Sequence, residues 1–205
     1  DALLARVREL EAENRQLVAQ QEGWALLDTL CGLLPAATEP ALLIERVLER
    51  IVTLRGHRLA AYGAVSGAEL SIAQRYPAAP PETPSHLTLP AEVLPSLSRH
   101  LPAAMNTAAL SSLREFLGED AAPTQGSLAL LPMQSEPELN SVMLVLDDQA
   151  DAFTGRALTA LNRVAELLSA RLENLTLVQR LRELSSNLDL QVVQRTQQME
   201  GTVAE

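Results

Sequence analysis

Seven positions in the first 34 residues, five of them apolar, recur at alternating spacings of four and three. These positions are Leu3, Val7, Leu10, Asn14, Leu17, Gln21 and Trp24, and charged residues lie between them. A narrow seam with charged flanks is typical of a coiled coil, and a polar Asn14 within it would set the register. We therefore predict a coiled-coil helix over 1–34. A single amphipathic helix lying on its own domain is the alternative.

A second helical pattern follows directly. Thr38-Glu39-Pro40 predicts a helix start with a capping side chain and a proline in the first turn. The apolar stripe of this helix is Leu43, Ile44, Val47, Leu48 and Ile51. Arg55-Gly56 predicts its end, because a basic last turn and a following glycine favour termination.

From residue 58 the period changes from helical to short apolar runs. Residues 59–65 and 69–76 predict a hairpin around Ser66-Gly67. Residues 127–133 and 141–146 are continuous Leu/Val/Met runs, as expected for central strands covered on both faces. Between the hairpins we expect a proline-rich loop over 77–102, a short strand at 86–89, a short helix within 91–101, a strand at 103–106 and a short helix at 110–117.

The last helix is predicted to begin after Thr154 and to continue without proline to Gly201, about 65–70 Å at 1.5 Å per residue. Its first half carries a broad apolar face, made by Leu158, Leu161, Val164, Ala165, Leu168 and Leu172. Its second half carries a narrower seam, made by Val178, Leu181, Ser185, Leu188, Val192 and Met199. The change near residue 174 predicts three parts: an N-terminal coil (1–34), a globular domain (35–174) and a C-terminal coil (175–205).

Composition narrows the functional classes. The net charge of −10 and an aromatic content of 2% argue against nucleic acid as a partner, because such binding needs basic residues and stacking aromatics. The single cysteine, Cys31, forms no intrachain disulfide and fits a cytoplasmic location. No stretch has the length of apolar residues needed for a membrane span. The start at Asp1 and the end within a helical pattern predict a segment of a longer protein.

The order of elements between 25 and 175 resembles a GAF domain, a sensory relative of PAS domains. The resemblance is carried by 57–65 with 67–73, by Ser127-Leu128-Ala129-Leu130-Leu131-Pro132-Met133, and by 142–146 followed by Phe153, Leu158, Leu161 and Ala165. It implies an α+β fold, with an antiparallel sheet of five or six strands and helices on both faces. The first and last helices would pack on one face, and the segment 77–125 would cover a pocket on the other.

The C-terminal residues 188–200 resemble the Leu-x-x-x-Val-x-x-Arg-Thr-x-x-Leu helix that joins bacterial sensor domains to histidine kinase or diguanylate cyclase outputs. Leu188, Val192 and Arg195-Thr196 match that pattern, and Met199 stands where leucine is usual. Because a parallel arrangement would present the seams of both terminal helices side by side along one axis, we predict a parallel homodimer that relays a signal through these helices.

Catalytic and cofactor signatures are missing from the sequence. It contains no G-x-G-x-x-G, Walker loop, H-E-x-x-H or G-x-S-x-G. His57, His86 and His100 lack ligand spacing, and one cysteine is too few for the methionine sulfoxide reductase branch of the GAF family. We therefore predict no enzyme activity, no cofactor and no metal. His57 is expected at a helix-to-strand corner.

Six residues are candidates for a pocket that binds an unidentified small molecule. They are Tyr62, Arg75, His86, Met105, Ser127 and Met133. Arg75 or His86 would pair with an anionic ligand, and Tyr62 with the methionines would supply apolar walls. Two functions remain open at this point: a ligand-binding sensor, and a ligand-free dimerisation and relay module with a filled core.

Overall fold

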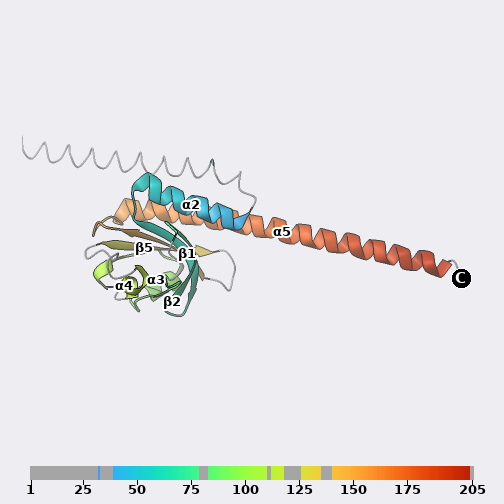
Figure 1. The fold of residues 1–205 in the computed structure, drawn as a ribbon, viewed down its shortest axis with the longest axis horizontal. Helices are drawn as coiled ribbons and strands as arrows, with labels where there is room; N and C mark the ends of the chain where they lie inside the picture. Colours follow the sequence, from blue (N-terminus) through green and yellow to red (C-terminus); the bar gives the residue numbers. More distant parts are fainter. Residues whose placement is uncertain are drawn as a thin grey trace, which may run out of the picture.

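The computed structural model describes Gly32 and residues 39–78, 83–109, 112–117, 126–134 and 140–203. These residues form one six-stranded antiparallel sheet in the order β3-β2-β1-β6-β5-β4 (Figure 1). The strands are β1 (Leu59–Ser66), β2 (Glu69–Tyr76), β3 (His86–Thr88), β4 (Ala103–Asn106), β5 (Ser127–Gln134) and β6 (Asn140–Asp147). The helices are α2 (Pro40–Arg55), α3 (Leu94–Ser98), the 3-10 turn η1 (Thr107–Ala109), α4 (Ser112–Leu117) and α5 (Gly155–Val203).

The predicted sheet is confirmed, with six strands and helices on both faces. Both predicted hairpins form, and the short elements expected between them are all present. The centre of the sheet is a pairing that joins distant parts of the chain, in which Ala61 on β1 lies opposite Leu144 on β6. Each hairpin therefore contributes two of the six strands, and β3 and β4 form the two edges of the sheet.

Helix α2 has the predicted bounds but not the predicted cap. Gly56 ends it with φ 68°, in the left-handed region that glycine adopts without strain, and donates its N–H to the Val52 carbonyl at 2.9 Å. The expected capping side chain is wrong, because the residue at the cap is Glu39 and its side chain makes no capping hydrogen bond. The start of the helix depends instead on Pro40, whose ring fixes φ at a helical value.

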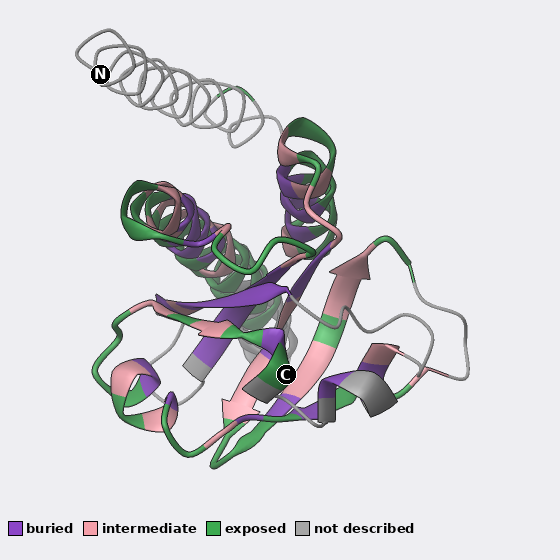
Figure 2. Ribbon diagram, turned by 90° about the vertical axis from the view of Figure 1, so that its left-hand side faces the viewer, coloured by how far each residue is buried: buried purple, intermediate pink, exposed green. Residues whose placement is uncertain are grey.

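The sheet separates two hydrophobic layers (Figure 2). On one face α2 lies over β1 and β2, and α5 lies over β5. The other face is covered by α3, α4 and the connecting segments. Because alternate residues of a strand point to opposite faces, Ala129 and Leu131 on β5 contact the α2/α5 layer, while Leu128 and Leu130 contact the α3/α4 layer.

Helix α5 leaves the globular part and projects beyond it (Figure 1). It contains 49 residues, about 73 Å at 1.5 Å per residue. Its broad apolar face is buried on the sheet as far as Leu172, and from Leu177 the described side chains are exposed. None of the described helices combines the length and apolar content that crossing a membrane requires.

Candidate functional site

The face of the sheet beneath α3 and α4 is the candidate ligand-binding face, because it is covered by short elements rather than by long helices. Its buried hydrophobic residues among those described are Leu59, Ala61, Leu70, Leu87, Leu89, Val93, Leu97, Leu113, Phe116, Leu128, Leu130, Val142, Leu144 and Leu146. Each is at most 8% exposed. Among the described residues this layer is therefore closely packed, as the interior of a folded domain normally is.

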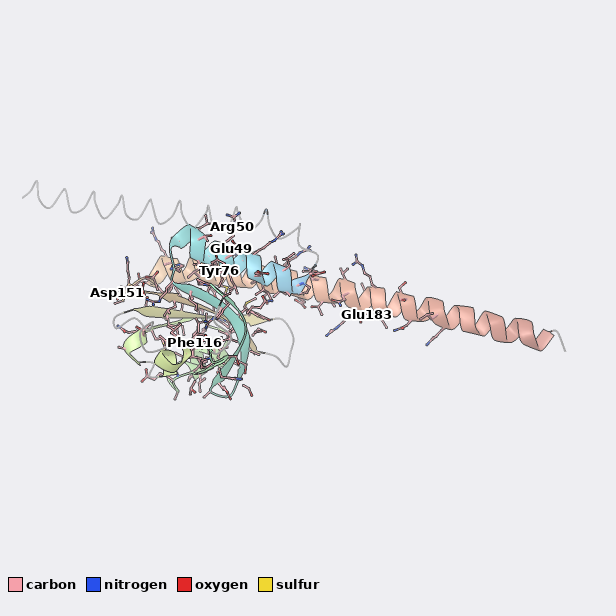
Figure 3. All side chains as sticks on the ribbon, viewed as in Figure 1. Glu49, Arg50, Tyr76, Phe116, Asp151 and Glu183 are labelled. Carbon is pink, nitrogen blue, oxygen red and sulfur yellow. The ribbon has the colours of Figure 1, made fainter. Side chains whose placement is uncertain are left out.

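Arg75 brings a charge to this face. Its guanidinium carbon lies 5.3 Å from the centre of the Phe116 ring on α4. Its Nε and Nη1 atoms are buried and have no hydrogen-bond partner among the residues that the structure describes. Burial lowers the pKa of Arg75 from its usual value. Phe116 is 1% exposed and lies within the body of the domain (Figure 3).

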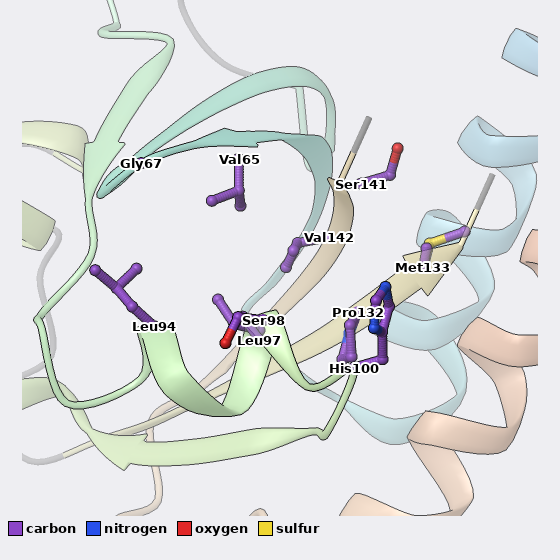
Figure 4. Close-up of a pocket in the computed structure, with 10 residues that line it drawn as sticks. All are labelled: Val65, Gly67, Leu94, Leu97, Ser98, His100, Pro132, Met133, Ser141 and Val142. Atoms are coloured by element: carbon purple, nitrogen blue, oxygen red, sulfur yellow. The ribbon is translucent and has the colours of Figure 1, made fainter. Parts of the chain in front are cut away.

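A small cavity of about 220 Å³ opens at another part of the domain, between α3, the β1–β2 turn and the end of the β5–β6 hairpin (Figure 4). It is lined by Val65, Gly67, Leu94, Leu97, Ser98, His100, Pro132, Met133, Ser141 and Val142. Pockets for drug-sized ligands usually hold about 300–1,000 Å³, so this cavity suits only a small molecule. Hydroxyl groups and His100 supply its polar atoms.

His57 contacts Asp147, the last residue of β6, just before the segment that leads into α5. Its Nδ1 lies 2.7 Å from a carboxylate oxygen of Asp147, and both side chains are nearly buried at 11% and 14% exposure. Its ring lies 5.3 Å from that of Phe153. The corner position predicted for His57 is confirmed, and the pair joins the α2–β1 corner to the end of β6.

Desolvation lowers the pKa of His57 despite the opposing effect of Asp147. The unfolded chain therefore binds this proton more readily than the folded one, so the contribution to stability is complete above the unfolded pKa of 6.5 and is lost as pH falls below it.

We expect the free energy of unfolding to decline on acidification below pH 6.5, and to decline less in His57→Gln. Urea titrations at several pH values measure this, with the exposed His86→Gln as control. An equal decline in His57→Gln and the native chain would contradict the assignment.

The structure divides the six candidate pocket residues between two faces and an edge. Arg75 and Met105 lie on the α3/α4 face. Tyr62 and Met133 lie on the α2/α5 face, where the Tyr62 hydroxyl donates to Ser141 Oγ at 3.1 Å.

The remaining two candidates lie apart from both groups. Ser127 donates its hydroxyl to the Gln149 carbonyl at 2.7 Å. His86 is on the edge strand, 59% exposed and 3.1 Å from Glu69. The six candidates therefore do not gather at one place among the described residues. Ligand contact by any one of them stays a prediction.

Two contributors were not predicted as site residues. Phe116 was predicted only as part of a short helix, and the fact that its ring faces Arg75 depends on how α4 packs on the sheet. Asp147 lies 90 residues from His57 in the sequence and was not among the predicted site residues. No local sequence signal reports either contact. Among the described residues, no three His, Cys, Asp or Glu side chains come together as a metal site.

The predicted dimer residues are described only in part. Leu3, Val7, Leu10, Asn14, Leu17 and Trp24 lie outside the described residues, and so does the side chain of Val192. Val178, Leu181 and Leu188 are on the projecting part of α5, exposed by 44%, 66% and 60%. Leu177 and Leu184 are also exposed there, by 48% and 59%, and were not in the predicted seam.

The fold is shared with solved structures at low sequence identity. No family model matches the chain. No curated protein matches it either. The free methionine-R-sulfoxide reductase from Neisseria meningitidis aligns with a TM-score of 0.59 at 13% identity, over 75% of this chain and 89% of the reductase. The A. aeolicus nlh2 GAF domain aligns with a TM-score of 0.58 at 13% identity, over 75% of this chain and 96% of that domain.

The GAF domain of a putative sensor histidine kinase from Pseudomonas syringae pv. tomato is also similar, with a TM-score of 0.54 at 18% identity. The alignment covers 82% of this chain and 98% of that domain. At such identities the comparisons establish a GAF-like fold and nothing about chemistry.

Proposed function

We propose that this chain is a non-catalytic sensory module of a bacterial cytoplasmic signalling protein. It binds a small molecule and relays the signal through a parallel dimer of its terminal helices to an output domain outside these residues, which we propose is a histidine kinase. The observation that carries the proposal is the continuity of α5, from its sheet-packed half to an exposed stripe of leucines. The GAF-like fold and the similarity of residues 188–200 to a signalling helix support it.

The exposed stripe has the geometry of a dimer seam. Leu177, Leu181, Leu184 and Leu188 are spaced by four, three and four residues. At 3.6 residues per turn they fall within an arc of about 60°. The same rotation places them about 170° from the buried face of α5, on the side directed away from the sheet. Packing these four exposed leucines against a second copy of the helix would remove their apolar surface from water. The stripe therefore favours a helix–helix dimer.

Strand β5 supplies a short route from the candidate ligand face to α5. Leu128 and Leu130 pack in the α3/α4 layer, while Ala129 and Leu131 pack in the layer that contains α5. A ligand that shifts the first pair therefore moves the surface on which α5 lies. Because α5 is one continuous helix, such a shift rotates or splays the projecting half.

The alternative function is ligand-free dimerisation and relay. The close packing of the α3/α4 layer, with buried residues at most 8% exposed, favours this reading. The Nε and Nη1 atoms of Arg75 favour the sensor function, because buried donors without an acceptor destabilise a closely packed core.

Cysteine cross-linking tests the relay geometry. In a Cys31→Ser background, we expect Leu181→Cys to form an interchain disulfide rapidly under mild oxidation, because the seam places the two copies side by side. Leu190→Cys is the matched control, since Leu190 is also exposed, by 59%, but points to the opposite side of the helix. Rates are read from non-reducing gels. Equal cross-linking at the two positions would exclude the proposed seam.

A further inference from the structure

The guanidinium of Arg75 contacts an aromatic ring, and two of its nitrogen atoms have no hydrogen-bond acceptor among the described residues. It lies 5.3 Å from the centre of the Phe116 ring, a cation–π distance. Nε and Nη1 are both buried, and neither has an acceptor in the described part of the chain. Arg75 as a whole is only half-buried, so part of its side chain remains open to solvent.

The described hydrophobic residues on the face of the sheet that carries Arg75 are largely buried. The buried cluster on this face consists of aliphatic residues and Phe116. An N–H donor removed from water without an acceptor destabilises the fold, and more so when it carries charge. A ring face offsets only part of that cost. An anion that accepts from Nε and Nη2, which lie on one edge of the guanidinium, would supply the acceptor that Nε lacks.

We infer that Arg75 recognises the carboxylate of a small monocarboxylic acid bound on the α3/α4 face. The inference rests on the proposed sensory function and names its ligand class. A planar guanidinium donates two parallel hydrogen bonds to a carboxylate, a geometry that a lone ammonium does not offer. A single cation in an apolar layer is complementary to a ligand that has one negative charge and a short aliphatic chain. Phosphate carries more charge than this face balances.

The binding step needs only a local rearrangement. Arg75 is on β2 opposite Ala61 of β1, so its backbone is fixed within the sheet. Rotation about the last bonds of the side chain turns the guanidinium edge that carries Nε and Nη2 toward a carboxylate that enters from the solvent-exposed part. The cation then exchanges a ring contact for two charge-assisted hydrogen bonds.

Thermal unfolding with defined anions tests the site. Sodium propionate, sodium acetate and inorganic phosphate are each added to the native chain at constant ionic strength. We expect propionate to raise the Tm most, by about 5–10 °C at a hundredfold excess over its Kd, and phosphate to leave it unchanged. In Arg75→Gln the propionate effect is lost, and in Arg75→Lys it is reduced. Arg50→Gln, at an exposed position on α2, keeps the full effect.

A second measurement covers the case in which Arg75→Gln does not fold. The ¹⁵Nε signal of Arg75 in the native chain should move on addition of propionate and remain in place on addition of chloride. The site is overturned if no carboxylate shifts the Tm or this signal, or if phosphate acts as strongly as propionate. A further variant replaces Glu82, Glu119 and Asp120 with the corresponding amides. Propionate binding that is seen only in this variant would overturn the proposed site, because Arg75 would then belong to an intramolecular ion pair.

Failure of this site is distinguishable from failure of the sensory module. Sedimentation velocity on the same samples reports the dimer independently of Arg75. A dimer that binds no carboxylate contradicts the ligand class and leaves the relay intact. A monomer contradicts the proposed function itself.

Discussion

Replacing Leu181 and Leu188 together with glutamate is expected to convert the dimer into a monomer. Both side chains are exposed on the projecting half of α5, by 66% and 60%, so in the proposed dimer they supply four leucines to the seam. Burial of a leucine contributes about 1.5–3 kcal/mol. The dissociation constant should therefore rise at least about 10³-fold, before the cost of desolvating the carboxylates is included.

Sedimentation velocity across a concentration series measures this change. The control is Leu190→Glu, which places the same charge on the same helix at a residue exposed by 59% but turned away from the seam. Circular dichroism should show an intact domain in both variants, because these leucines do not belong to the buried core. A double variant that stays dimeric, or a control that dissociates equally, would contradict the proposed interface.

Gly63→Ala is expected to be the most destabilising single methyl addition in the sheet. A Cβ at this position would lie 2.1 Å from the carbonyl oxygen of Ser71 and 2.9 Å from its carbonyl carbon. Both atoms are backbone of the paired strand β2, so they move only if the β1–β2 ladder moves. We expect the free energy of unfolding to fall by about 2–4 kcal/mol and the Tm by about 5–15 °C.

Gly67→Asn provides the comparison for Gly63→Ala. Gly67 has φ +62° and no atom near its Cβ position, and asparagine tolerates that conformation. This variant should therefore unfold close to the native Tm. Scanning calorimetry measures both, and a Gly63→Ala Tm within about 1 °C of the native value would contradict the crowding seen at the β1–β2 pair.

The register shift beside Gly63 explains why the candidate site was harder to predict than the fold. Strict alternation would place Ile72 and Arg75, three residues apart, on opposite faces of β2. The irregularity between Tyr62 and Gly63 inserts one residue, so that both contact the α3/α4 layer. A bulge of this kind has no signal in an apolar strand pattern. The faces of Tyr62 and Arg75 were therefore not readable from the sequence.

Local chemistry made the elements themselves predictable. The glycine after Arg55 and the turn at Ser66-Gly67 mark their boundaries, and the proline-free stretch after Thr154 predicts one long helix. The pairing of β1 with β6 joins segments about 80 residues apart, and apolar runs covered on both faces do not specify a partner. The GAF resemblance implied an antiparallel sheet of five or six strands, and the pairing of β1 with β6 was not predicted.

The second half of α5 was predicted in outline. The change from a broad buried face to an exposed seam follows from the leucine spacing, and Leu181 and Leu188 belong to the stripe in both descriptions. Leu177 and Leu184 complete the stripe at spacings of four and three, which favours a register different from the one built on Val178 and Ser185. Both registers share Leu181 and Leu188, so the sequence alone did not separate them.

Native mass spectrometry of the freshly purified chain tests the central claim most directly, because it reports oligomer mass and retained ligand together. The proposed function predicts a dimer at micromolar concentration, with added mass when a small carboxylate remains bound. It also predicts that Leu181→Glu/Leu188→Glu appears at the monomer mass. A native chain that is monomeric at that concentration would contradict the proposal that α5 relays a signal through a dimer.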